Sequence, residues 1–191
     1  MHFRGRYLLY ARLNMATIGQ RFVQMTVSHA CADGHLPGPG QWERFRPIAI
    51  DGYTPQGGNV YFFSVSMNPV SLDSLIALVP VAQNRAACVA ASFSRDGLRW
   101  SPLQPLTVCT TDLESEHARS ELERLKSFAT YRGHRSTSQP AANVLLWKDR
   151  VLIFIHEQVP GIGERGQARL VRYSMPIAKF AAWTNASLAS M

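Results

Sequence analysis

The chain has 191 residues, of which 46% are apolar and 17% charged, and 20 basic against 13 acidic side chains give a formal charge of +7. This apolar content offsets the entropy cost of ordering a chain, which excludes wholesale disorder and a collagen-like structure. Every apolar stretch is shorter than the roughly 18 residues that a membrane span needs. We therefore expect a soluble globular chain.

Arginine and cysteine usage excludes further classes. The basic residues are almost all arginines, scattered from Arg4 to Arg172, which favours a solvated basic surface suited to anionic ligands over a nucleic-acid-binding arm. The 3 cysteines form no C-x-x-C pair and have no histidine at metal spacing. The sequence thus predicts neither a disulfide framework nor a metal site, and no cofactor. No signal peptide is visible, which leaves the compartment open.

Val, Ile, Phe and Tyr recur with a period of two along most of the chain, which is typical of β-strands. The strongest strand candidates are 6–13, 21–28, 59–66, 74–81, 87–94, 143–147, 151–157 and 168–173. Turn-forming pairs such as Asp33-Gly34 and Asp96-Gly97 separate them, and several connections have hairpin length. Neighbouring strands should therefore pair antiparallel.

Residues 112–126 differ from the rest of the chain. This segment is charged, lacks glycine and proline, and places its leucines roughly on one face, a pattern that predicts one amphipathic helix. We interpret residues 111–127 as a helical insertion packed on a β-domain. A helix that binds a partner is the alternative.

A similar unit recurs three times along the sequence. Two strands, an Asp-Gly turn and a tryptophan follow one another up to Trp42 and again up to Trp100, and a looser copy without Asp-Gly ends at Trp183. The units cover approximately 5–48, 49–106 and 140–184 within one domain, 1–191. Repetition every roughly 50 residues is typical of propeller blades.

The most specific motif is the segment 94–101, Ser-Arg-Asp-Gly-Leu-Arg-Trp-Ser. The Asp96 carboxylate can accept bonds from backbone amides of the turn, and Gly97 can supply a positive φ. Trp100 would then fill the space between neighbouring blades. We interpret Asp96 as a brace of an Asp-box-like turn rather than a catalyst.

The strand from Tyr7 to Asn14, this turn, and residues 139–143 before the strand 151–158 resemble blade segments of the five-bladed β-propeller glycoside hydrolases and their relatives. The resemblance implies an all-β fold of antiparallel propeller-like blades with one helical insertion. In that family a funnel at the propeller axis binds sugar, and carboxylates on inner strands act as general acid, base and stabiliser.

The sequence departs from the family in two ways. About three units use up the chain, so the five-bladed propeller would be incomplete and we expect a fragment, beginning inside a strand at Gly5 with no strand before it. The second departure concerns chemistry, since Gln139-Pro140 stands where those enzymes commonly have an acidic residue beside a proline.

Glycoside hydrolysis generally needs two carboxyl groups that face each other across the bond. Of the acidic residues outside the expected helix and turns, Asp51 and Glu157 lie next to buried strands, where a shifted pKa is plausible. Glu157 is a candidate general acid, with an ordinary strand-end carboxylate as the alternative. Asp51 is a candidate base or stabiliser, with a turn cap before Gly52 as the alternative.

Polar residues at strand ends and in one loop are candidate substrate-binding groups: Arg12, Asn14, Asn68, Arg135 and His156. Arg12 and Asn14 share one face of a strand, whereas the neighbours His156 and Glu157 face opposite sides. A role as loop anchor is the alternative for Arg12, Asn14 and Asn68. Arg135 would join a basic rim that suits an anionic sugar.

The leading hypothesis is a glycoside hydrolase-like propeller that acts on or binds a carbohydrate but is not catalytically competent as this chain. Under this hypothesis we expect neither a nucleic acid nor a membrane as a partner. The alternative is a non-catalytic protein-interaction module that uses exposed strand edges and the 112–126 helix. Exposed edges would also permit self-association.

Overall fold

The computed structural model describes residues 1–15, 20–29, 35–53, 58–60, 63–83, 86–106, 139–141, 144–157 and 169–191. These residues are mostly β-strand, and they include one α-helix, α2 (Ile177–Ala189). The strands are β1 (His2–Phe3), β2 (Arg6–Met15), β3 (Gln20–Val27), β4 (Arg46–Pro47), β5 (Ala49–Ile50), β6 (Gly58–Val60), β7 (Ser64–Met67), β8 (Leu75–Gln83), β9 (Ala86–Ser94), β10 (Arg99–Trp100), β11 (Gln104–Pro105), β12 (Gln139–Pro140), β13 (Leu145–Trp147), β14 (Arg150–Glu157) and β15 (Arg169–Pro176).

Sheet 1 contains β1, β2, β3 and β4 in that order, and each neighbouring pair is antiparallel. A two-residue turn joins β1 to β2, and both of its residues have positive φ, 49° at Arg4 and 75° at Gly5. Such turns match the twist of antiparallel strands. The expectation that no strand precedes Arg6 is therefore wrong, because β1 pairs with the start of β2.

Sheets 2 and 3 repeat this arrangement with interrupted first strands. In sheet 2, β6 and β7 share one edge of β8, and β9 and then β11 follow on the other side. In sheet 3, β12 and β13 share one edge of β14, and β15 lies on the other. The predicted antiparallel pairing is confirmed in all three sheets, while the short pair β5–β10 is parallel.

Helix α2 follows β15 directly, where the sequence prediction placed the end of a third strand unit. Trp183 therefore lies on a helix, and its assignment as the tryptophan that ends a third strand unit is wrong. The segment is rich in alanine, a strong helix former. Its buried residues recur at helical spacing: Phe180, Thr184, Ser187 and Leu188.

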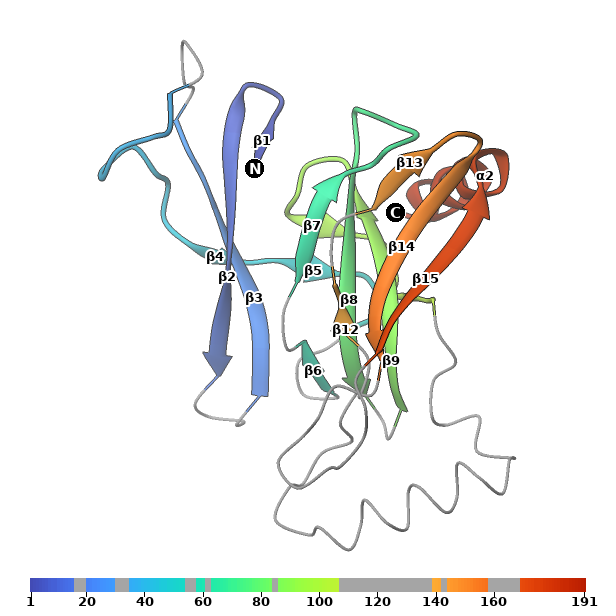
Figure 1. Ribbon diagram of the computed structural model, residues 1–191. Coiled ribbons are helices and arrows are strands. Elements are labelled where there is room, and N and C mark those ends of the chain that lie inside the picture. Colours follow the sequence, from blue (N-terminus) through green and yellow to red (C-terminus); the bar gives the residue numbers. More distant parts are fainter. Residues whose placement is uncertain are drawn as a thin grey trace, which may run out of the picture.

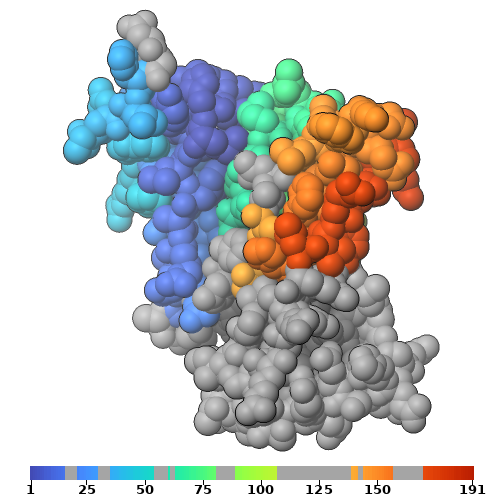
Figure 2. Space-filling model, viewed as in Figure 1, coloured from blue at the N-terminus to red at the C-terminus, as the bar shows by residue number. Residues whose placement is uncertain are grey.

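The three sheets lie side by side with sheet 2 in the middle (Figure 1). Alternate residues of β8 face opposite sides, so Leu75 and Val79 join a core shared with sheet 1, and Ile76 and Leu78 join a core shared with sheet 3 and α2. In the space-filling view the blue, green and orange-to-red segments follow one another across one face (Figure 2). Sheet 2 is thus buried on both sides.

The expected helix 112–126 and the Asp33-Gly34 turn lie outside the described residues. In the part of the chain that the structure describes, no helix has the length and apolar character needed to span a membrane.

Candidate functional site

The turn between β9 and β10 has the bonding expected of an Asp-box. One oxygen of the Asp96 carboxylate accepts bonds from the backbone N–H groups of Leu98 and Arg99, both at 2.8 Å, and from the Ser94 hydroxyl at 3.1 Å. The Ser94 hydroxyl in turn accepts a bond from the Gly97 N–H at 2.8 Å. The prediction that Asp96 braces the turn is confirmed, because its carboxylate is used by its own backbone.

The same turn joins sheet 2 to sheet 1. The Gly97 carbonyl accepts bonds from the Trp100 indole N–H and from the Tyr10 hydroxyl of β2, both at 2.9 Å. Trp100 is fully buried, and its ring meets Phe63 edge-on at 4.8 Å and Tyr10 at 6.1 Å between centroids. Trp100 therefore fills the space between neighbouring sheets, as the motif predicted.

The partly buried Tyr10 and the buried Tyr53 have raised pKa values. Burial raises the pKa of Tyr10 well above its usual value, and the negative charge of Asp96 raises it further. Burial alone raises the pKa of Tyr53 to about 12. The Tyr53 ring stacks on Phe22 at 5.9 Å, and its hydroxyl is buried without a hydrogen-bond partner among the described residues. Both hydroxyls therefore keep their protons to a higher pH in the fold than in the unfolded chain.

These shifts make the protein less stable in alkali. An unfolded tyrosine releases its proton above about pH 10, whereas the folded protein keeps it. The free energy of unfolding should therefore fall from that pH upward by about 1.4 kcal/mol per pH unit for each tyrosine. Urea unfolding between pH 8 and pH 11 measures this slope. In Tyr10→Phe the slope should be shallower, and an unchanged slope would contradict the role of Tyr10.

Arg12 and Asn14 lie on one face at the end of β2, and both are exposed. Nearer the start of the strand the same face is buried at Leu8. Cross-strand pairing places Asn14 opposite Arg21 of β3, a neighbour that the sequence alone did not identify because it depends on register. Two guanidinium groups and an amide thus gather at one end of sheet 1.

Asp51 follows β5 at the boundary between sheets 1 and 2. Its backbone N–H donates to the Trp100 carbonyl at 2.9 Å, and Gly52, which follows it, has a φ of 70°. Asp51 thus begins a turn that leaves the parallel pair β5–β10. This placement matches the turn position that was the alternative to a catalytic role.

His156 and Glu157 end β14, where they pair with Leu170 and Arg169 of β15. His156 is exposed. The strand β14 is interior to sheet 3, with β12 on one side and β15 on the other. Glu157 therefore ends a strand that has neighbouring strands on both sides. β2, β8 and β14 run in the same direction, so Asn14 and Glu157 are at corresponding strand ends (Figure 1).

Asn68 is fully buried between sheet 2 and α2. Its amide nitrogen donates to the hydroxyls of Ser74 at 3.1 Å and Thr184 at 3.4 Å, and its amide oxygen accepts a bond from the Val70 N–H at 3.1 Å. These partners place Asn68 in a network that fixes a loop to the helix. Arg135, the remaining candidate, lies outside the described residues.

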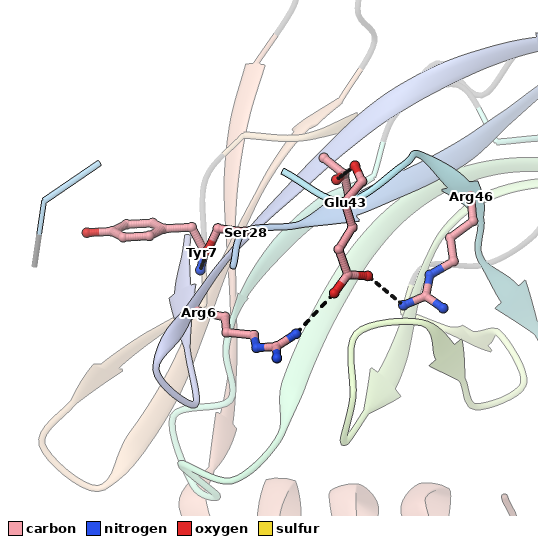
Figure 3. Close-up of polar contacts among 6 residues, drawn as sticks. Arg6, Tyr7, Ser28, Glu43 and Arg46 are labelled. Atoms are coloured by element: carbon pink, nitrogen blue, oxygen red, sulfur yellow. Dashed lines mark hydrogen bonds and ion pairs between the residues drawn. The ribbon is translucent and has the colours of Figure 1, made fainter. Parts of the chain in front are cut away.

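Glu43 organises a polar cluster on sheet 1 that the sequence reasoning did not single out (Figure 3). Its carboxylate forms ion pairs with Arg6 at 3.1 Å and Arg46 at 3.5 Å, and its backbone carbonyl accepts a bond from the Thr26 hydroxyl at 2.6 Å. All three charged side chains are partly exposed, so each ion pair contributes little stability. The cluster holds the connection before β4 against sheet 1.

The described residues contain no group of three or more His, Cys, Asp or Glu side chains arranged to hold a metal ion. No family model matches the sequence, and no curated protein or solved structure shows significant similarity to it.

Proposed function

We propose that the chain forms three propeller-like blades that bind an anionic carbohydrate without hydrolysing it. The observation that carries the proposal is the Asp-box turn of Ser94 to Trp100, in which the carboxylate, the glycine and the tryptophan have the roles that the blade motif assigns to them. Three antiparallel sheets stacked in chain order are consistent with consecutive blades.

The polar end of sheet 1 supports an anionic sugar as the ligand. Arg12 is exposed there beside Asn14, and Arg21 pairs with Asn14 across the strands. Guanidinium groups bind carboxylates through paired, charge-assisted hydrogen bonds. An amide such as that of Asn14 can both donate to and accept from sugar hydroxyls. In this proposal His156 is a further contact at the corresponding strand end of sheet 3, and Asn68 has a structural role.

The absence of turnover is proposed from the carboxylates. Sheet 3 opens with Gln139 and Pro140 in β12, so no acid stands at the start of that strand. Asp51 begins a turn beside Trp100, and Glu157 ends a strand that is interior to its sheet. A glycosidase needs two carboxyl groups facing one another across the scissile bond, and Asp51 and Glu157 are the pair that would have to converge.

Isothermal titration calorimetry of the protein with a disaccharide that contains glucuronic acid tests the proposal. We expect this sugar to bind more tightly than the matching glucose disaccharide, because only the acidic sugar can pair with a guanidinium group. Arg12→Ala should weaken binding of the acidic sugar by about tenfold, the effect of one charge-assisted hydrogen bond.

Arg99→Ala is the matched control, because Arg99 is an exposed arginine of β10, which pairs with β5 and not with β2 or β3. It should leave the affinity unchanged. Equal weakening by both variants, or no binding of either sugar, would refute the assigned site. Cleavage of an aryl glycoside that is lost in Glu157→Gln would instead refute the absence of turnover.

A further inference from the structure

In sheets 1 and 2 a short strand pairs with the outer edge of the last long strand, which is β3 in sheet 1 and β9 in sheet 2. We call β3, β9 and the corresponding β15 of sheet 3 the third strands. The strand β4 pairs with β3 through Arg46 and Pro47, and β11 pairs with β9 through Gln104 and Pro105. Both pairs are antiparallel. The chain therefore provides two examples of how the outer edge of a third strand is occupied.

The two outer strands share one chemical pattern, a proline followed by a large aliphatic residue. The N–H of Ile48, after Pro47, donates to the Val23 carbonyl at 3.2 Å, and the N–H of Leu106, after Pro105, donates to the Val89 carbonyl at 2.8 Å. A proline has no N–H and is tolerated at a strand position that needs no ladder bond. The third strand thus recognises an extended Pro-aliphatic segment through its outward carbonyls.

No second strand pairs with the corresponding edge of sheet 3 among the described residues, since the strand partner of β15 is β14. The Ile177 N–H donates to the Asp149 carbonyl at 3.0 Å. This bond shows which residues of β15 direct their backbone groups toward β14. Because bonded and non-bonded positions alternate, the backbone groups of Leu170 and Arg172 point away from β14. Ser174 has the same phase, but its carbonyl accepts a bond from the Arg150 guanidinium at 3.4 Å, so the open part of the edge is at Leu170 and Arg172. Pro176 has the same phase and ends the free edge.

The exposure and charge of the residues along this edge indicate which kind of strand could pair with it. Leu170 is 57% exposed, and Arg172 and Ser174 are also exposed. Residues 169–191 contain three basic side chains, Arg169, Arg172 and Lys179, and no acidic one. A second copy of this chain, with its net charge of +7, would be repelled. An acidic segment is attracted instead.

We propose that the free edge of β15 binds an extended, acidic segment of a partner protein that contains a Pro-aliphatic pair, adding it antiparallel as the outer strand of sheet 3. Strand addition of this kind obtains affinity from main-chain hydrogen bonds and specificity from alternate side chains. The edge is distinct from the carbohydrate site at the end of β2 and does not depend on it.

Fluorescence anisotropy with a short labelled peptide tests this inference. The probe carries the Gln-Pro-Leu sequence of β11 flanked by glutamates. A first control peptide has an N-methylated leucine, which removes the donor that Leu106 uses on β9. A second has lysine in place of each glutamate. We expect the probe to bind and each control to bind at least about tenfold more weakly.

Two protein variants separate backbone from charge. Arg172→Thr keeps the outward N–H and removes the charge, so it should weaken binding and reduce its salt dependence. Arg172→Pro also removes the N–H and should weaken binding further. Circular dichroism checks that each variant is folded. If Arg172→Pro does not fold, the N-methylated peptide still tests the backbone contact. No binding of the probe, or binding that neither N-methylation nor Arg172→Thr changes, would overturn the proposal.

Discussion

Replacing Gly97 with alanine should lower the free energy of unfolding by about 2 to 5 kcal/mol, combining left-handed strain with overpacking. Gly97 has a φ of 79°, and an added Cβ would lie 2.6 Å from the Tyr10 hydroxyl oxygen and 2.9 Å from a Leu8 methyl carbon. Neither neighbour can easily move, because the Tyr10 hydroxyl donates to the Gly97 carbonyl and Leu8 is buried. Urea unfolding of both proteins measures the difference.

Gly52→Ala separates the two contributions. Gly52 has a similar φ of 70°, but no atom lies within 4 Å of its added Cβ, so only the strain of about 1 kcal/mol should remain. Tyr10→Phe in the Gly97→Ala background removes the closest atom and should recover part of the loss. Equal destabilisation by the two glycine replacements would show that the contact between sheets 1 and 2 is looser than described.

The second large effect is expected for Trp100→Ala, about 3 to 5 kcal/mol, the cost of truncating a buried aromatic side chain. Trp100 is fully buried, contacts the rings of Tyr10 and Phe63, and donates its indole N–H to the Gly97 carbonyl. Its removal leaves a cavity between sheets 1 and 2. The midpoint of urea unfolding at constant slope reports the change.

Trp147→Ala provides the matched control for this truncation. Trp147 ends β13 and is 62% exposed, so we expect a change within about 0.5 kcal/mol. Trp100→Phe keeps a ring but loses the indole donor, and its effect should be intermediate. A small effect of Trp100→Ala would contradict the assignment of this residue as the side chain that fills the space between the two sheets.

The sequence predicted the strands well because most of them are short runs of strand-forming residues, such as Val, Ile and Phe, bounded by turn-forming residues. It also predicted the Asp-box turn, since Asp96 and Gly97 have local roles that depend on neighbouring residues alone. Helix α2 was missed, because its buried residues include Thr184 and Ser187, which do not stand out as apolar. The strand β1 was missed because it is only two residues long.

The candidate site was less predictable. Sequence spacing placed Arg12 and Asn14 on one face, but the approach of Arg21 depends on the register of β2 and β3. In the sequence, Asn68 is a polar residue at the end of a predicted strand. In the structure its amide nitrogen donates to the hydroxyl of Thr184, a residue far along the chain. Such long-range partners cannot be inferred from a local sequence pattern. Asp51 and Glu157 were chosen as candidate catalytic residues only because they lie next to buried strands in the sequence.

The placement of β8 between two cores determines how the protein can open. Leu75 and Val79 belong to one core, and Ile76 and Leu78 to the other, so sheet 2 cannot unfold without exposing both. Sheet 1, or sheet 3 with α2, can separate and leave one core intact. Local opening should therefore begin at the outer sheets, and the backbone amides of β8 and β9 should exchange their hydrogens only when the whole molecule unfolds.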